Sequence, residues 1–322
     1  MAIRLVVRKR GTVQIFRDLL ILSRFHKYNP WLATFSGVWS ALLAGILKTR
    51  SSPAAISTTF VFRQALMVFL AAYAFCGAGM VWNDWIDCDI DANVARTKNR
   101  PLAAGRLTSI EALVWMFVQL IISWYLLHVM LGGSNVWITL IPVTISSFLY
   151  PFAKLPIARK LYIFPQYILG FSLAYPAVAG WMAIYGKEQT FLETAGHCLP
   201  LCTFVFCWTL YLNTAYSYQD IEDDSKMNLN SAYFLAGNHI HIFLTTLALL
   251  VLVTIPFVLH TFGSSWLWTS WMGIWTVSYA YQLLNFDAKK PAGGGSIHKS
   301  NFALGMWTTI ICAIELLLKS NS

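Results

Sequence analysis

Long apolar runs alternate with short polar segments along almost the whole chain of 322 residues. A helix needs about 20 mostly apolar residues to cross the hydrocarbon core of a bilayer. Nine runs approach that length, at 30–48, 60–81, 110–131, 135–151, 163–185, 196–215, 239–260, 266–284 and 302–319. The pattern therefore predicts an all-α integral membrane protein with about nine transmembrane helices in a single bundle.

Composition supports this fold class, because 57% of the residues are hydrophobic and only 11% are charged. Soluble domains carry roughly 25% charged residues. The net charge of +9 does not indicate nucleic acid, since membrane proteins concentrate Lys and Arg in their cytoplasmic loops. We expect the lipid bilayer as a partner, and we expect neither nucleic acid nor an obligate protein partner.

The basic residues are distributed unevenly between the two sets of loops. With a cytosolic N-terminus, most Lys and Arg fall on the cytosolic face, in segments 1–29, 82–109, 152–162, 216–238 and 285–301. Residues 1–29 are predicted to be a basic, cytosol-facing segment that carries an amphipathic surface helix, and residues 30–319 form the membrane domain. A mitochondrial presequence is the alternative for the N-terminus. We expect the endoplasmic reticulum or another endomembrane.

Two acidic clusters follow apolar runs on this predicted cytosolic face. The first contains Asp84, Asp87 and Asp91, and the second contains Asp220 and Asp224. Spacings of three and four place side chains on one face of a helix. Carboxylates are ligands of hard cations, and Mg²⁺ commonly joins a few of them to substrate phosphates. The clusters thus predict a Mg²⁺ site facing a central cavity, against the alternative of solvated helix ends.

Cations suited to phosphate lie between the clusters. Arg96, Arg100 and Lys154 are the expected phosphate contacts, because Arg offers a planar fork and Lys a point charge. Membrane topology alone is the competing explanation for these residues. The six cysteines form no CxxC pair and are interpreted as packing residues.

The ordered set of motifs resembles the UbiA superfamily of membrane prenyltransferases. Asn83-Asp84-x-x-Asp87-x-x-x-Asp91 is similar to its NDxxDxxxD signature, and Asp220-x-x-x-Asp224 with Lys226 is similar to its second acidic motif. The segment from Arg96 to Leu102, together with Gly105, resembles its R-x-x-x-R-P-L-x-x-G loop, and Tyr150 to Lys154 resembles its YPxxK element. The segment from Arg24 to Pro30 looks most like fungal members that act in meroterpenoid pathways.

The resemblance implies Mg²⁺-dependent transfer of a prenyl group, with farnesyl diphosphate as the expected donor, to a ring carbon of a phenolic, polyketide-derived acceptor. It implies that Asp84, Asp87, Asp91, Asp220 and Asp224 are catalytic metal ligands. The implied substrate-binding residues are Asn83, Arg96, Arg100, Lys154, Lys226 and Tyr150. The sequence departs from the family pattern at Asn213, Asn228 and Asn230, which puts the geometry after the second motif in doubt.

Two other functions remain open at this level. A 4-hydroxybenzoate polyprenyltransferase of quinone biosynthesis would carry the same motifs. A membrane transporter would instead place charged or broken helices at mid-membrane. The acids of this chain cluster at predicted helix ends on one face, which disfavours transport.

Overall fold

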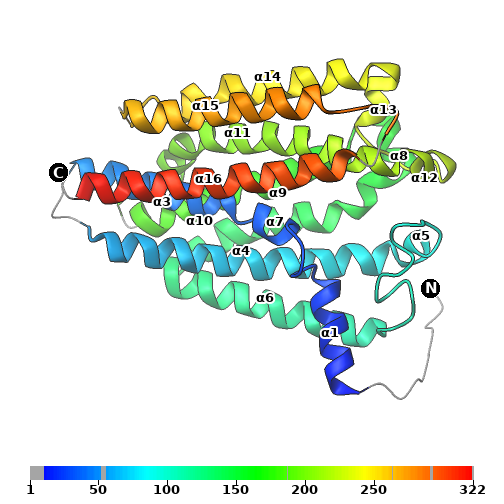
Figure 1. Cartoon of the computed structure of the whole chain (residues 1–322). Coiled ribbons are helices and arrows are strands. Elements are labelled where there is room, and N and C mark those ends of the chain that lie inside the picture. Colours follow the sequence, from blue (N-terminus) through cyan, green and yellow to red (C-terminus); the bar gives the residue numbers. More distant parts are fainter. Residues whose placement is uncertain (1–10, 52–55, 187, 263, 291–292, 321–322) are drawn as a thin grey trace.

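The computed structural model describes residues 11–51, 56–186, 188–262, 264–290 and 293–320. Within these ranges every regular element is helical. The long helices run side by side in one bundle, and α1 (Thr12–Leu22) lies across it near one end (Figure 1). The predicted all-α bundle is thus confirmed, whereas the part of the predicted basic segment before Gly11 lies outside the described residues.

The bundle is built from ten longer helices. They are α3 (Phe35–Ser51), α4 (Thr58–Ile86), α6 (Ser109–Leu131), α7 (Asn135–Leu149), α9 (Pro165–Ala174), α10 (Pro176–Tyr185), α11 (Phe191–Ser217), α14 (Ile240–Leu259), α15 (Ser265–Leu284) and α16 (Gly294–Ser320). Short elements join them: α2 (Asn29–Leu32), α5 (Cys88–Asp91), η2 (Pro151–Lys154), α8 (Pro156–Lys160), η3 (Tyr218–Asp220), α12 (Ile221–Lys226), α13 (Tyr233–Ala236) and η4 (Gly237–His239).

Eight helical segments of the described chain are long and apolar enough to cross a membrane. α9 and α10 together make one of them, and α2 with α3 makes another. The remaining predicted span, 266–284, corresponds to α15, a helix of 20 residues without a charged side chain. It is not among those eight, and its sequence is rich in Trp and Tyr residues. It packs between α14 and α16, so the bundle contains all nine predicted runs.

Capping residues fix where two of the spans begin. Thr108 and Glu111 form a reciprocal capping box at the start of α6, and Thr190 and Glu193 form another at the start of α11. Each box satisfies backbone N–H groups that the first helical turn leaves unpaired. α11 therefore starts at Phe191, earlier than the hydropathy pattern predicted, because its polar first turn is stabilised by this cap.

The prediction that residues 285–301 form a loop was wrong for its second half. α16 begins at Gly294, and Pro291 and Ala292 lie outside the described residues. A Cβ atom on Gly294 would lie 2.2 Å from the carbonyl oxygen of Ala215. The glycine is therefore required for close helix packing against α11. Because glycine has low hydropathy, the apolar pattern did not predict that the helix starts here.

A cluster of aromatic rings forms the core between α3, α11 and α15. The ring centroids of Trp39 and Trp208 lie 5.4 Å apart, and those of Phe204 and Trp275 lie 4.9 Å apart. All four side chains are buried. Edge-to-face and tilted arrangements of this kind add specific attraction to the burial of large apolar surfaces.

A buried polar network holds α16 against α11 and α15. Asn301 accepts a hydrogen bond of 2.7 Å from Trp208 Nε1 and donates one of 2.8 Å to Gln282 Oε1. Gln282 Oε1 also accepts from the hydroxyl of Tyr211, at 3.1 Å. Because an unpaired polar group is costly in an apolar interior, this network specifies the register of the three helices.

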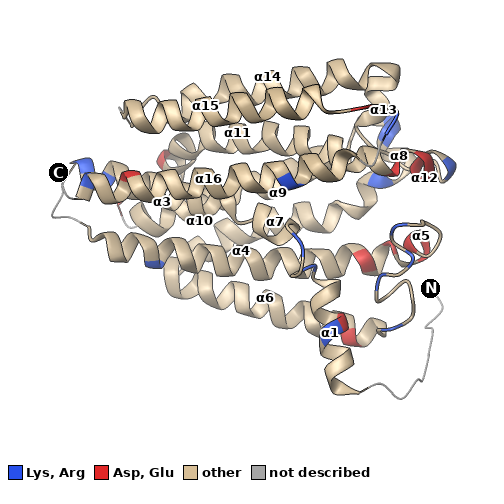
Figure 2. Cartoon of the chain, viewed as in Figure 1, with Lys and Arg blue, Asp and Glu red and all other residues tan. Residues whose placement is uncertain are grey.

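Charged side chains gather at one end of the bundle, around α5, α8 and α12, and fewer lie at the opposite end (Figure 2). Between the two ends, the long helices carry few Lys, Arg, Asp or Glu. The bundle therefore presents one strongly charged end next to an apolar middle.

Candidate functional site

A cavity of about 440 Å³ opens at the charged end of the bundle and runs into its apolar interior. Both acidic clusters line its mouth. Its deeper walls carry mostly small and apolar side chains from α4, α6, α7, α9 and α10, among them Val68, Ala71, Leu127, Val143 and Leu173. The cavity thus combines a polar mouth with an apolar chamber.

The first acidic cluster stands at the end of α4. The prediction of one continuous helical face was wrong in detail, because α4 ends at Ile86 and Asp91 belongs to the short helix α5. The backbone nevertheless keeps a helical course, since the N–H of Asp87 donates to the carbonyl of Asn83 at 2.9 Å and that of Asp91 to Asp87 at 2.8 Å. Asp84, Asp87 and Asp91 are therefore all buried and all line the cavity.

Each of these carboxylates is paired with a basic side chain. Arg100 donates to Asp84 at 2.9 Å and to Asp91 at 2.6 Å. Lys154 donates to Asp87 and, at 2.6 Å, to Asn83 Oδ1. Removing one member of such a buried pair would leave an uncompensated charge, which is strongly destabilising. Burial raises the pKa of Asp91, and Arg100 opposes that shift.

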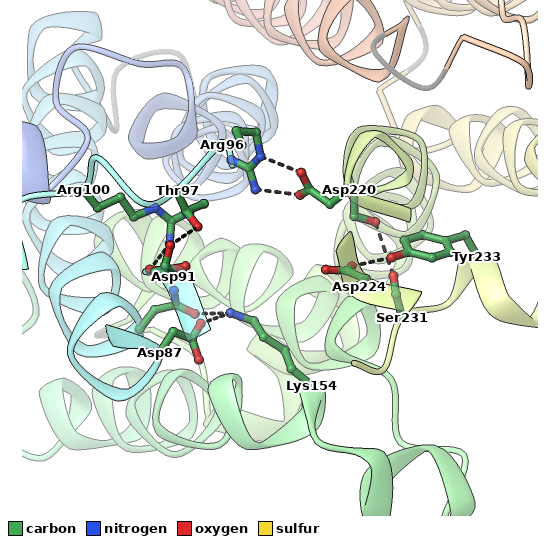
Figure 3. Close-up of polar contacts among 12 residues, drawn as sticks. Asp87, Asp91, Arg96, Thr97, Arg100, Lys154, Asp220, Asp224, Ser231 and Tyr233 are labelled. Carbon is green, nitrogen blue, oxygen red and sulfur yellow. Dashed lines mark hydrogen bonds and ion pairs between the residues drawn. The ribbon is translucent and has the colours of Figure 1, made fainter. Parts of the chain in front are cut away.

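The second cluster faces the first across the mouth of the cavity (Figure 3). Asp220 ends η3 and accepts a bidentate pair from Arg96, with both nitrogen–oxygen distances at 2.6 Å. Asp224 lies one turn further on in α12 and accepts a hydrogen bond from the hydroxyl of Tyr233. Arg96 comes from the loop after α5, so this ion pair links the segment that follows the first cluster to the second cluster.

Arg24 is a site residue for which the sequence analysis assigned no role. It lies in the link between α1 and α2, in a left-handed backbone conformation with φ 57°, and its Nη2 donates to Asp84 at 2.6 Å. Burial alone would lower the pKa of Arg24, but Asp84 raises it above its ordinary value. The sequence did not indicate this role, because Arg24 precedes the first apolar run and lies outside both acidic motifs.

Of the other two predicted substrate-binding residues, Tyr150 lies at the cavity and Lys226 does not. Tyr150 lines the cavity, and its ring centroid lies 4.9 Å from Lys154 Nζ. Lys226 lies outside the cavity lining, where its side chain is 74% exposed and lies 4.0 Å from Asp223. The structure thus brings Asn83, Arg96, Arg100, Lys154 and Tyr150 to the cavity with the five aspartates, but not Lys226.

Asn230, one of the departures from the family pattern, ties the second cluster to Lys154. Its Nδ2 donates to the carbonyls of Ala153 at 2.8 Å and Ile163 at 2.7 Å, and its backbone N–H donates to the carbonyl of Lys154 at 2.7 Å. The amide therefore fixes the segment that presents Lys154 to the cavity.

The donor set fits Mg²⁺ in chemistry. No three acid, His or Cys side chains of the described chain converge as a ready-made metal cage. Mg²⁺ needs no such cage, because it is usually bound through one or two carboxylates and substrate phosphates. Asp84, Asp87 and Asp91 on one wall and Asp220 and Asp224 on the other offer hard oxygen ligands around one cavity mouth.

Comparison with known proteins gives the chain a consistent set of relatives. The pattern of the UbiA prenyltransferase family matches residues 37–304. The polyprenyl transferase esdpC of Penicillium shearii is 57% identical over 317 residues, which cover 98% of this chain and 97% of that one.

Solved structures share the fold at much lower identity. A UbiA homologue from Aeropyrum pernix K1 superposes with a TM-score of 0.63 at 21% identity, over 89% of this chain and 97% of that one. A homologue from Archaeoglobus fulgidus, bound to GPP and Mg²⁺, superposes with a TM-score of 0.56 at 15% identity, over 91% and 99% of the respective chains.

Proposed function

We propose a specific reaction for this chain, which belongs to the UbiA prenyltransferase family and is a multi-pass membrane transferase. In this reaction the chain transfers a prenyl group from its diphosphate to a ring carbon of a phenolic, polyketide-derived acceptor. Farnesyl is the expected group, and Mg²⁺ the expected metal. The proposal extends to meroterpenoid biosynthesis at an endomembrane, with the charged end of the bundle in the cytosol.

The observation that carries the proposal is the set of exchangeable ion pairs at the mouth of an apolar cavity. Arg24, Arg96, Arg100 and Lys154 neutralise four of the five aspartates. A metal–diphosphate would satisfy both halves of these pairs, because the carboxylates would bind the metal and the cations would bind phosphate oxygens.

The same residues account for the chemistry of the leaving group. Departure of diphosphate from the prenyl C1 atom develops negative charge on the bridging oxygen. Arg96, Arg100 and Lys154 would stabilise that charge, and bound Mg²⁺ would supply Lewis-acid stabilisation there. The resulting allylic cation would be attacked by an electron-rich ring carbon beside a hydroxyl group.

The depth of the cavity suits the apolar tail of the donor. Along α4 the lining residues extend from Asp84 to Val68, a distance of about 24 Å at 1.5 Å per residue. The small side chains of Ala71 and Ala72 line this stretch. The tail would therefore lie between helices in the bundle while the diphosphate remains at the charged end.

The test uses membranes that contain the expressed chain. We would supply Mg²⁺ with C10, C15 and C20 prenyl diphosphates and a panel of phenolic acids that includes orsellinic acid derivatives and 4-hydroxybenzoate. A Mg²⁺-dependent, EDTA-sensitive adduct detected by mass would support the proposal. An adduct with 4-hydroxybenzoate alone would favour the quinone-pathway alternative, and no adduct from any pair would contradict aromatic transfer.

A further inference from the structure

The proposed reaction needs a group that accepts a proton from the acceptor, and the acids of the cavity are already engaged. Asp84 and Asp91 are paired with arginines, Asp87 with Lys154, Asp220 with Arg96, and Asp224 accepts from Tyr233. These five side chains are also the expected metal ligands. This leaves deprotonation of the ring hydroxyl to a side chain other than these five aspartates.

His298 has the properties of such a base. It lines the cavity and is only 6% exposed. Its imidazole packs against the rings of Tyr216 and Tyr28. A buried neutral imidazole can accept a hydrogen bond and a proton on one ring nitrogen.

The helix packing places this imidazole beside the second acidic cluster. Gly294 lets α16 approach the carbonyl of Ala215, and one turn later His298 lies against Tyr216, with ring centroids 4.5 Å apart. Tyr28 supports the imidazole from outside the cavity lining, at a centroid distance of 6.2 Å. Asn301, in the next turn of α16, is fixed by its hydrogen bonds to Trp208 and Gln282.

Lys27 gives the same region a positive charge. It lines the cavity, and no salt bridge connects it to a described carboxylate. Burial lowers the pKa of Lys27, and the nearby Arg24 lowers it further. An anionic oxygen on the acceptor would meet a cation here, which fits an acceptor that reacts as its phenolate.

We propose that His298 is the catalytic base that deprotonates the ring hydroxyl of the acceptor, with Tyr216 as the aromatic surface against which the acceptor ring lies and Lys27 as the cation beside the resulting oxyanion. This assignment rests on the proposed function. It places the acceptor between the start of α16 and the link from α1 to α2, next to the diphosphate site.

The electrons and protons of the step balance within the site. The hydroxyl proton passes to an imidazole nitrogen of His298, and a ring carbon of the phenolate supplies the electron pair of the new C–C bond. The bond between the prenyl C1 and oxygen breaks with its pair leaving on diphosphate. The sp³ ring carbon then loses its proton to the diphosphate, and the imidazolium returns its proton to the ring oxygen.

The test compares three glutamine substitutions in membranes that contain the full chain. His298→Gln retains hydrogen bonding but cannot accept a proton, and it should lower the rate of aromatic transfer by about 10²–10⁴-fold, as loss of a general base does. Mg²⁺-dependent release of prenyl alcohol from the donor should persist, because the diphosphate site is intact. His128→Gln is the matched control, since His128 lies exposed on α6 and stacks on Trp124. His26→Gln tests the other histidine of the cavity.

Chemical rescue separates a catalytic role from a structural one. Added imidazole should restore part of the transfer in His298→Ala and none in Asp87→Ala. Near wild-type transfer in His298→Gln would overturn the assignment, and so would a loss confined to His26→Gln. Loss of both transfer and prenyl alcohol release in the His298 variants, without rescue, would show a structural role and overturn it too. Failure of the wild-type chain to form any adduct would contradict the proposed function itself.

Discussion

Arg96 and Asp220 are 124 positions apart in sequence, yet they form a bidentate ion pair across the mouth of the cavity. The fork of the guanidinium matches the two carboxylate oxygens, which a lysine cannot reproduce. The pair connects the loop after α5 to the end of η3, so an ion pair links the segments that carry the two acidic clusters (Figure 3).

Arg96→Lys tests the importance of this geometry for donor binding. The substitution keeps the charge and removes the fork, so we expect kcat/KM for the prenyl diphosphate to fall about tenfold, in line with the loss of one charge-assisted hydrogen bond. Initial rates against donor concentration would check this. Lys98→Arg is the control, because Lys98 is exposed and outside the cavity lining. Equal effects of the two substitutions would argue against a specific contact.

Asp87→Ala and Asp220→Ala should each abolish transfer while the chain still inserts into membranes. Each change removes an expected metal ligand and leaves Lys154 or Arg96 without its partner. Product formation would measure transfer, and the amount of each variant extracted from membranes would measure insertion. Asp89→Ala serves as the control, since Asp89 is exposed within the same motif. Activity retained in both variants would contradict the metal-site assignment.

Removal of divalent metal should stop the reaction reversibly. EDTA is expected to abolish transfer and excess Mg²⁺ to restore it, whereas Ca²⁺ should restore much less. The larger ion takes more ligands in looser geometry, so it would orient the diphosphate less well. Turnover that persists after exhaustive chelation would exclude the proposed metal role.

Lys154 and Lys226 should respond differently to alanine. Lys154 contacts Asn83 and Asp87 in the cavity, so Lys154→Ala should reduce transfer by at least about 10²-fold through loss of electrostatic stabilisation. Lys226 is exposed outside the cavity lining, so Lys226→Ala should change the rate less than about threefold. Product rates at saturating donor would check both variants, and a large loss in Lys226→Ala would contradict the placement of Lys226 outside the site.

Ala72→Trp should shift the preference for donors toward shorter chains. Ala72 lines the cavity 12 residues before Asp84, about 18 Å along α4. A bulky ring there would block the tail of a C20 donor before that of a C10 donor. Leu66→Trp is the control, because Leu66 lies on the same helix with its side chain exposed. Unchanged relative rates for the three donors would place the tail elsewhere.

The bundle and most of the cavity mouth were predictable because both leave periodic signals in the sequence. Apolar runs predicted the helices, and the spacing of Asp84, Asp87 and Asp91 predicted that they face one site. His298 and Arg24 were missed for a physical reason. His298 precedes the predicted apolar run 302–319 in a Gly-rich stretch, and Arg24 precedes the first predicted run in a basic stretch. The close contact of Gly294 with Ala215 brings His298 to the cavity, and the ion pair with Asp84 brings Arg24 there.

The pairing of cavity aspartates with Arg24, Arg96, Arg100 and Lys154 has a thermodynamic consequence for ligand entry. A metal ion arriving alone would have to displace cations that then lack an anion, and a diphosphate arriving alone would leave carboxylates without a cation. Each ligand therefore lowers the free-energy cost of binding the other. By linkage, Mg²⁺ should tighten donor binding by the same factor as the donor tightens Mg²⁺ binding, and the empty protein should bind either one weakly.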